Sequence, residues 1–303
     1  MKTLLTGATG LIGQKLLERL GPSIVLSRNP ERARRSMGGA EVAAWDPEAG
    51  PPRPEVFEGV DVIFHLAGEP VGEGRWTQER KRRIRDSRVV GTRNLVAGLA
   101  RLTQRPRVLV CASAVGFYGN RGDELLDERS PAGSGFLADV CVEWEREAQA
   151  ARPLGMRVVL VRTGLVLSPD GGALAKMLTP FRLGAGGRLG DGRQWMPWIH
   201  VEDEVGLLLH AMNDERVEGA LNAVAPRPVT NRDFTEALGH AVHRPALLPV
   251  PKTALRLAFG EMSEILLVSQ RALPKEAERT GYAFKYPELR QALDAMVHHR
   301  EVA

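Results

Sequence analysis

The sequence predicts an α/β fold in which a doubly wound parallel sheet is followed by a smaller, mostly helical region. Short, β-branched, continuously apolar runs recur along the first half of the chain, and such runs are typical of strands buried on both faces of a sheet. Helical segments separate the runs, and a glycine-rich turn joins the first run to the first helix. Alternation of this kind predicts a parallel sheet with helices on both sides, the Rossmann arrangement.

The individual elements follow from these patterns. The expected strands are residues 2–6, 23–27, 42–45, 61–67, 107–113 and 157–163. The expected helices between them are residues 11–20, 77–104 and 136–151. We therefore expect a Rossmann domain over residues 1–165, to which some later segments return.

The alternation weakens after residue 165, where glycine-rich loops precede short helices. These helices are expected around residues 230–241, 253–270 and 287–297. Because ligands of open parallel sheets bind at the carboxyl ends of the strands, we expect residues 166–303 to form the substrate side. This region includes a small helical C-terminal domain at about 250–298.

The composition predicts an ordinary soluble protein of the cytoplasm. The 303 residues are 43% hydrophobic and 26% charged. Cys111 and Cys141 lie far apart, so we expect no zinc site, no other metal and no disulfide, and two free thiols fit a reducing compartment. No apolar run approaches the ~20 residues of a membrane span, so we expect no membrane partner. The N-terminus lacks the apolar core of a signal peptide.

The charge of the chain does not indicate a nucleic-acid partner. The formal net charge is only +4, which is mildly basic. The stretch RKRRIR (80–85) lies in an expected helix, where it is flanked by Gln78, Glu79 and Asp86. No aromatic residue follows it at base-stacking spacing. We interpret this stretch as a solvated helix face and expect no nucleic acid to bind there.

The turn TGATGLIG (6–13) predicts a dinucleotide site. Gly7 permits the tight turn, Gly10 lets the backbone approach a pyrophosphate, and Gly13 lets the helix pack closely on the sheet. We assign the intervening Thr9, Leu11 and Ile12 to the same cofactor-binding loop. The alternative is a glycine-rich turn that binds nothing, but the context of first strand, turn and helix favours the dinucleotide.

The end of the second strand predicts NADP rather than NAD. An NAD enzyme usually carries an acidic residue here for the ribose 2′-OH, whereas this chain has Ser27 and Arg28, and arginine suits a 2′-phosphate. Glu31 could in principle serve NAD instead, and Arg28 could be a solvated surface charge. Further arginines that could join the pocket are Arg32, Arg34 and Arg35.

The segment HLAGEP (65–70) follows the fourth strand. Its small residues favour close approach of the backbone, so we expect Leu66, Ala67 and Gly68 to lie along the adenosine and ribose of the cofactor. The alternative is a plain turn at a strand end.

The motifs TGATGLIG, LSRNP, HLAGEP, SAVGFYG and WIHVED together resemble the short-chain dehydrogenase/reductase superfamily in its extended, epimerase-like form. Longer motifs narrow the resemblance: RWTQERKRRIRDSRVVGTRNLV, PFRLGAGGRLGDGRQWMPWIH and FGEMSEILLVSQRALPKEAERTGYAFKYPEL. They are similar to an atypical subfamily of NADP-binding, nucleoside-diphosphate-sugar-epimerase-like proteins with a small helical C-terminal domain. The resemblance spans nearly the whole chain.

The resemblance also shows what this chain lacks. Superfamily members generally use a tyrosine as acid/base, a lysine four residues later and a serine that orients the substrate. Phe136 stands at the tyrosine position and Val140 at the lysine position. Only Ser113 resembles the serine, to within one residue. The usual proton relay is therefore absent.

The resemblance assigns two further cofactor contacts. Arg88, where many extended members have asparagine, looks like a contact to a cofactor phosphate or ribose, although it could equally be one more charge on a helix face. Val166 stands where the superfamily's backbone borders the nicotinamide, and its alternative is an ordinary core valine.

Two side chains are candidates for catalysis. Ser113 could orient a carbonyl or hydroxyl, or it could satisfy backbone groups at a strand end. Cys141 could act as an acid if its pKa were tuned, but an inert buried thiol is the more ordinary interpretation. We expect structural roles for His200 and Tyr118.

The sequence thus predicts an NADP(H)-binding oxidoreductase or epimerase-like enzyme that acts on a small carbonyl or sugar-like substrate. The alternative is a non-catalytic module that binds or senses NADPH. A nucleic-acid binder, which rests only on mild basicity, is the third interpretation. A homodimer through the two long helices is possible, as in similar superfamily members.

Overall fold

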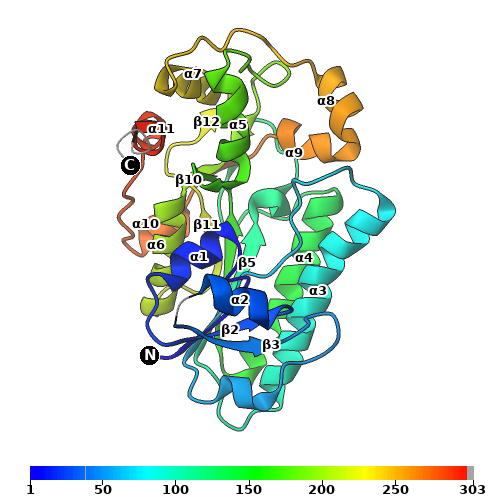
Figure 1. Cartoon of the computed structure of the whole chain (residues 1–303), viewed down its shortest axis with the longest axis vertical. Coiled ribbons are helices and arrows are strands. Elements are labelled where there is room, and N and C mark those ends of the chain that lie inside the picture. The colour runs from blue at the N-terminus through cyan, green and yellow to red at the C-terminus, as the bar shows by residue number, and fades with distance from the viewer. Residues whose placement is uncertain (38, 299–303) are drawn as a thin grey trace.

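The computed structural model describes residues 1–37 and 39–298. Seven parallel strands form the central sheet in the order β11-β7-β5-β4-β1-β2-β3 (Figure 1). The strands are β1 (Thr3–Thr6), β2 (Ser23–Ser27), β3 (Glu41–Ala44), β4 (Val62–His65), β5 (Val108–Ala114), β7 (Arg157–Thr163) and β11 (Gly219–Ala223). The predicted α/β class with a doubly wound parallel sheet is confirmed.

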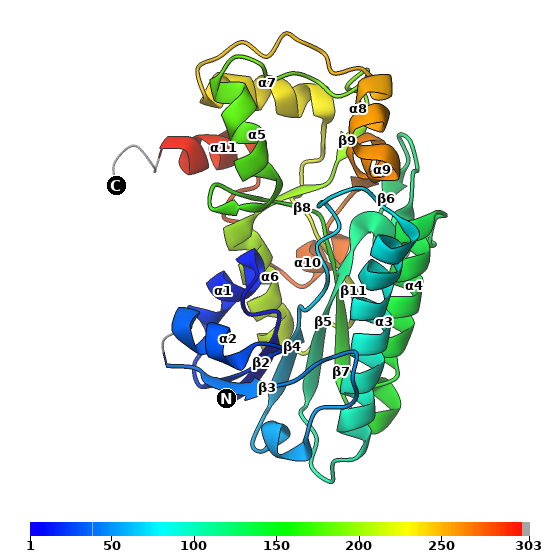
Figure 2. The same cartoon turned by 45° about the vertical axis from the view of Figure 1, so that its right-hand side comes forward.

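Helices cover both faces of this sheet (Figure 2). One face packs against the long helices α3 (Gln78–Ala100) and α4 (Phe136–Gln149) through a core that includes Leu95, Leu99 and Trp144. The other face carries α1 (Leu11–Leu17), α2 (Pro30–Ser36) and α6 (Val201–Asn213). Since β11 and α6 come from the second half of the chain, that half completes the sheet as well as forming a region of its own.

The second region lies beyond the carboxyl ends of the strands and is mostly helical (Figure 1). Its helices are α5 (Gly172–Arg182), α7 (Asn231–Ala241), α8 (Lys252–Phe259), α9 (Glu264–Leu267) and α11 (Leu289–His298), whereas α10 (Lys275–Arg279) packs on β11 of the main sheet. Short 3-10 turns are Pro54–Phe57, Val115–Tyr118, Arg152–Leu154 and Gly260–Ser263. Leu178, Phe181, Trp198 and Leu238 belong to the separate apolar core of this region.

Three two-stranded sheets connect the two regions. The parallel pairs are β8 (Leu165–Ser168) with β10 (Trp198–His200) and β6 (Leu125–Leu126) with β13 (Arg271–Ala272), and the antiparallel pair is β9 (Trp195–Met196) with β12 (Val229–Thr230). These pairs place segments from residues 120, 195 and 270 beside one another at the carboxyl edge of the main sheet.

Several elements differ from the sequence expectation. The fourth strand ends at His65 because the next backbone bends towards the glycine turn. The helix expected at 253–270 is three pieces, interrupted at Gly260 with its φ of 60°. The helices α2, α5, α6 and α10 and the strand β11 were not predicted. An Asn29 cap and Pro30 in the first turn hold α2, and α5 contains Pro180.

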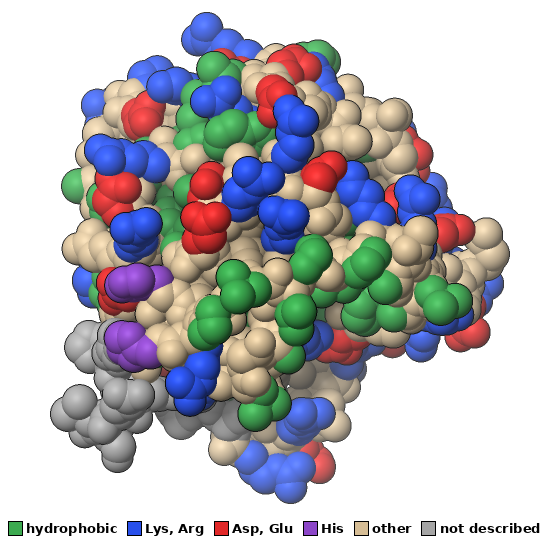
Figure 3. Space-filling model, turned by 90° about the horizontal axis from the view of Figure 1, so that it is seen from above, with side chains coloured by type: hydrophobic (Ala, Val, Ile, Leu, Met, Phe, Trp, Pro, Cys, Tyr) green, Lys and Arg blue, Asp and Glu red, His purple; other side chains and the backbone are tan. Residues whose placement is uncertain are grey.

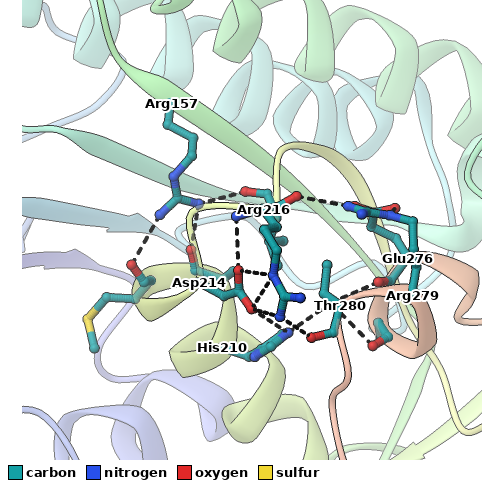
Figure 4. A network of polar contacts seen from close by, with 11 residues as sticks. Arg157, His210, Asp214, Arg216, Glu276, Arg279 and Thr280 are labelled. Carbon is teal, nitrogen blue, oxygen red and sulfur yellow. Dashed lines mark hydrogen bonds and ion pairs between the residues drawn. The ribbon is translucent and has the colours of Figure 1, made fainter.

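Polar contacts hold the segment around α10 against the end of α6 and the turn that follows it (Figure 4). Arg216 pairs with Asp214 at 2.6 Å and donates to the carbonyl of Thr280 at 2.7 Å. Arg279, on α10, donates back to the carbonyl of Arg216 at 2.9 Å, and His210 on α6 contacts the Thr280 hydroxyl at 2.8 Å. These contacts join α10 to the end of α6.

A buried carboxylate anchors the next part of the same segment. Asp203 on α6 is 1% exposed and accepts hydrogen bonds from the amides of Lys285 at 2.7 Å and Tyr286 at 2.9 Å, and from the Tyr282 hydroxyl at 3.1 Å. The same hydroxyl lies where a side chain at Gly206 would be, because a Cβ there would come within 2.0 Å of it. The segment therefore packs directly on the backbone of α6.

None of the helices in the described ranges, 1–37 and 39–298, has the length and apolarity that crossing a bilayer requires.

We expect Asp203→Ala to lower the free energy of unfolding by about 3 kcal/mol, since it removes a buried charged acceptor and leaves two backbone amides without a partner. Urea denaturation followed by circular dichroism measures this. Glu124→Ala, which removes an exposed carboxylate paired with Arg121, is the control and should change stability by less than about 0.5 kcal/mol. Equal effects of both variants would contradict the anchoring role.

Candidate functional site

The glycine turn between β1 and α1 packs tightly against the end of β4. Gly7 has a φ of +75°, and a Cβ on it would lie 2.7 Å from the carbonyl carbon and oxygen of Leu66. A Cβ on Gly13 would lie 2.3 Å from the carbonyl oxygen of Gly7. The Ala67 amide donates to the Thr6 hydroxyl at 3.2 Å, which fixes the two strand ends side by side.

This contact lies where the strand order reverses. The chain runs outward from β1 to β2 and β3 on one side and continues with β4, β5 and β7 on the other. The crevice at such a switch point is where open parallel sheets bind nucleotides. The structure thus brings together the predicted loop residues around Gly10 and the predicted segment 66–68. Thr9 and Leu11 also border a hollow of about 440 Å³ whose far wall includes Gly171.

Arg28 stands free at the end of β2. Its side chain is exposed and makes no hydrogen bond or ion pair within the part of the chain that the structure describes. The side chains on either side of it already make hydrogen bonds. The Ser27 hydroxyl accepts from the Asn29 amide at 3.1 Å, and Asn29 caps α2 by accepting from the Arg32 amide at 3.0 Å. A guanidinium in this position is available to a phosphate.

Arg88 holds the loop that follows β4. Its Nη1 donates to the carbonyls of Glu69 at 2.9 Å and Ile84 at 3.0 Å, and its guanidinium lies over Trp144. A Cβ on Gly68 would come within 3.0 Å of the guanidinium carbon. Burial lowers the pKa of Arg88. The surface-charge alternative for Arg88 is therefore wrong, and its contact to a cofactor stays a prediction.

The position of the superfamily's tyrosine is apolar. The ring of Phe136, at the start of α4, meets Trp76 edge-on with 5.2 Å between centroids, and the Lys81 ammonium lies 5.3 Å from the Phe136 centroid. Trp76, Ile84 and Met262 are buried here, with Val71, Phe136, Leu137 and Ile265 packed against them. Val140, one turn along α4, is 2% exposed. Neither position supplies a proton donor.

The C-terminal helices close this apolar cluster from above. Lys81 on α3 forms an ion pair with Glu261. Arg75 donates to the carbonyls of Leu257 and Ala258 at the end of α8, the latter at 3.3 Å. These contacts connect the loop after β4 with the helical C-terminal region.

Ser113 belongs to a buried polar network. Its hydroxyl donates to Glu145 at 2.7 Å, and Glu145 forms a two-pronged ion pair with Arg162 at 2.8 and 2.9 Å. Arg162 also donates to the Tyr118 hydroxyl at 3.0 Å, which in turn donates to Asn222 on β11 at 2.6 Å. Burial raises the pKa of Tyr118 to about 12, which supports its structural role.

Sequence reasoning missed this network, although one signal was available. Arg162 lies inside the apolar run RVVLVRT, and a charged residue within a strand buried on both faces requires a buried partner. The partner, Glu145, could not be identified from spacing, because it comes from α4, 17 residues earlier. Ser113 thus supports the buried Glu145 carboxylate, while its predicted role in catalysis stays untested.

Cys141 is a buried thiol. It is 4% exposed, and burial followed by the nearby Glu145 carboxylate raises its pKa to about 12. Cys111, on β5, is fully buried and its pKa is also raised by burial. This geometry favours the inert-thiol interpretation over proton transfer by Cys141, a role that stays an untested prediction.

The remaining candidates occupy structural positions. His200 is buried, accepts from the Glu202 amide at 3.0 Å and stacks on Tyr286; burial lowers its pKa to about 4. Val166 lies on β8 beside Ile199 and packs on the main core. Trp195 is half-buried under the Arg271 guanidinium, which lies 4.2 Å from the ring centroid. The described residues contain no group of three His, Cys, Asp or Glu able to hold a metal ion.

The comparisons with known proteins agree with this geometry. The model of the NAD dependent epimerase/dehydratase family matches residues 3–223. The chain belongs to this family. A domain of unknown function, DUF1731, matches residues 250–296, which include α8 to most of α11. The resemblance inferred from the sequence motifs is confirmed at the level of the family.

Relatives match over nearly the full length. Epimerase family protein Mb2239 of Mycobacterium bovis is 43% identical over 95% of both chains, and epimerase family protein YfhF of Bacillus subtilis is 37% identical over 99% of both. The crystal structure of human epimerase family protein SDR39U1 (isoform 2) with NADPH is 33% identical and has a TM-score of 0.86 over 98% of this chain and 99% of that one. The two chains therefore share their fold over nearly their whole length.

The structure predicts that native thiols react slowly. Because Cys141 and Cys111 are buried and their pKa values are raised, Ellman's reagent at pH 8 should label neither within minutes in native protein, and both after unfolding in urea. The absorbance of the released thiolate measures this. Rapid native labelling that disappears in Cys141→Ala would contradict the assignment and restore Cys141 as an acid candidate.

Glu204 gives the fold a pH-dependent stability. It is 1% exposed, only its Oε1 accepts a hydrogen bond, from Thr163 at 2.8 Å, and burial raises its pKa from the usual 4.5 to about 8. Between these values the unfolded chain releases this proton while the folded chain keeps it, so stability falls as the pH rises.

We expect Glu204→Gln to remove this loss, which amounts to about 1.4 kcal/mol per pH unit inside the window. Urea denaturation at pH 5 and pH 8 should show the variant gaining on the wild type at the higher pH. Glu236→Gln, on the exposed side of α7, is the matched control and should leave the pH dependence unchanged. Parallel wild-type and Glu204→Gln profiles would contradict the burial of a neutral carboxyl group.

Proposed function

We propose that this chain binds NADP(H) and acts as an oxidoreductase or epimerase-like enzyme on a small carbonyl or sugar-like substrate. The observation that carries the proposal is the point where the strand order reverses, at which the glycine turn after β1 packs on the backbone of Leu66 after β4 and the free Arg28 stands at the end of the neighbouring strand β2. The human relative crystallised with NADPH supports the same cofactor.

The residues present fit such a cofactor. Side chains at Gly7 or Gly13 would collide with backbone, so glycine at both positions lets the turn and α1 pack closely on the strand ends, and Gly10 at the start of α1 would approach the pyrophosphate. Arg28 is suited to a 2′-phosphate because its guanidinium offers several donors and has no carboxylate partner in the described chain. The backbone along the adenosine and ribose of the cofactor would be that of Leu66, Ala67 and Gly68.

The protein's own part in the chemistry is positioning. The nicotinamide supplies the hydride when it is bound, and the chain orients both partners and keeps water away. Trp76, Phe136 and Met262 provide an apolar wall at the place where the superfamily has its phenol. Proton transfer then falls to water, to the substrate or to a side chain other than the absent tyrosine.

A non-catalytic NADPH-binding module is the second candidate, and the same apolar wall favours it. A cofactor crevice that is kept beside a lost acid/base pair is what a sensor would show. Steady-state oxidation of NADPH by any member of a panel of aldehydes, ketones and sugar nucleotides would exclude this candidate. If turnover is found, unchanged rates in both Ser113→Ala and Cys141→Ala would show that neither residue is catalytic.

A homodimer through α3 and α4 remains a further part of the proposal. Their outer surface carries interhelical ion pairs of Arg85 with Glu143 and Arg93 with Glu147. Light scattering at micromolar concentrations decides whether this surface is shared by two copies.

We expect calorimetric titration to show NADPH binding at least about 100-fold more tightly than NADH, and Arg28→Ala to weaken NADPH by about 10- to 100-fold while leaving NADH nearly unchanged. Arg83→Ala, an exposed arginine on α3, is the control and should change neither affinity. Preference for NADH, or equal affinities in Arg28→Ala and wild type, would overturn the assignment of the 2′-phosphate site.

A further inference from the structure

The helical end of the molecule carries an unusual concentration of exposed apolar side chains. Five of the eight exposed large hydrophobic residues in the described chain lie there: Leu183 at 78%, Leu247 at 80%, Leu248 at 63%, Leu257 at 79% and Phe259 at 38%. Seen from this end, hydrophobic side chains form a band across the surface, and charged side chains of both signs, with many lysines and arginines, lie around it (Figure 3). A band of this kind marks an interaction surface.

Most of the apolar side chains of helix α8 are exposed to solvent. Of its eight residues only Leu255 is buried, while Ala254, Leu257, Ala258 and Phe259 are exposed. A helix that packed as part of a core would bury this stripe. The segment before α8 is fixed against the loop at 186–190, because the Val250 amide donates to the carbonyl of Arg188 at 2.8 Å. The exposed leucines are therefore held on a defined backbone.

Basic side chains without counterions lie beside the band. Arg188 and Arg232 form no ion pair and no side-chain hydrogen bond in the described chain, although their Cβ atoms both lie 3.3 Å from the position of a Cβ on Gly192. A hollow of about 560 Å³ opens between α7 and the following loop, and its walls include Arg188, Arg232, His240, His243, Arg244 and Leu247. Glu236 is the one carboxylate in the described wall, against three guanidinium groups.

We propose that this end of the molecule docks on the surface of an anionic phospholipid membrane. The leucines and Phe259 would enter the boundary between headgroups and acyl chains, and the hollow would receive headgroup phosphates. This combination of protruding apolar side chains and adjacent uncompensated cations is the chemistry that binds lipid interfaces. The contact is peripheral and needs no spanning segment, so it departs from the sequence expectation of no membrane partner.

Other occupants fit the observations less well. A second copy docked face to face would place one arginine-lined surface against another of the same kind, because a two-fold interface pairs a surface with itself. A nucleic acid would use the cations but leave the leucines in water. A lipid surface satisfies both sets of side chains at once.

Vesicle co-sedimentation of the full chain tests the proposal. Phosphatidylcholine vesicles are compared with vesicles that contain phosphatidylglycerol at three parts in ten. We expect binding to the anionic vesicles at least about tenfold stronger than to the neutral ones, and weakening as salt rises from 0.05 to 0.5 M, as roughly expected for screened charges.

Two variants separate the apolar and the charged contributions. Leu247→Glu with Leu257→Glu, and Arg188→Gln with Arg232→Gln, should each reduce binding to anionic vesicles about tenfold or more. The matched controls are Leu125→Glu, at an exposed leucine on β6, and Arg82→Gln with Arg83→Gln on α3, which should bind like the wild type. Circular dichroism and NADPH titration confirm that each variant is folded.

The opposing outcomes are equally definite. Failure to sediment with anionic vesicles overturns the proposal, as does binding that neither double variant changes. Light scattering that shows a dimer abolished by Leu247→Glu with Leu257→Glu would assign the surface to a second copy instead. None of these results depends on whether the chain turns over a substrate.

Discussion

The buried ion pair between Arg162 and Glu145 is the interaction on which the middle of this molecule depends. Arg162 lies buried on β7, the strand next to the edge strand β11, and a buried charge is tolerated only when its partner and its hydrogen bonds are complete. The pair connects β7 with α4, and through Tyr118 and Asn222 it reaches β11 as well. Elements from both halves of the chain therefore share one polar centre.

This network accounts for the unusual site. Ser113, the residue nearest to the superfamily's catalytic serine, is engaged by Glu145. The helix that would carry the tyrosine and lysine instead contributes Phe136 to an apolar cluster and Glu145 to the ion pair. The positions that resemble the superfamily's proton-transfer residues are thus used here for packing and for the buried ion pair.

The sequence was sufficient for six of the seven strands and for the glycine turn, because their signals are local, whereas β11 was not predicted. Apolar runs mark the strands, and the spacing of Gly7, Gly10 and Gly13 predicts a turn that the structure shows pressed against Leu66. The buried polar contacts were harder to predict from the sequence. That Arg88 lies inward, under Gly68, follows from the path of the loop after β4, and no sequence pattern reports it. Likewise, the separation of Arg162 from Glu145 hides a pair that only the packing of α4 on β7 creates.

The apolar cluster around Trp76 has a consequence for how the chain can be divided. One side of it comes from the loop and helices of the cofactor region, and the other from Met262 and Ile265 of the segment matched by a separate family model. Neither part has a complete surface without the other: cutting the chain before residue 250 would leave the Trp76 indole and the Phe136 ring facing water. The two matched regions therefore fold as one unit, and a chain shortened in this way would be prone to aggregate.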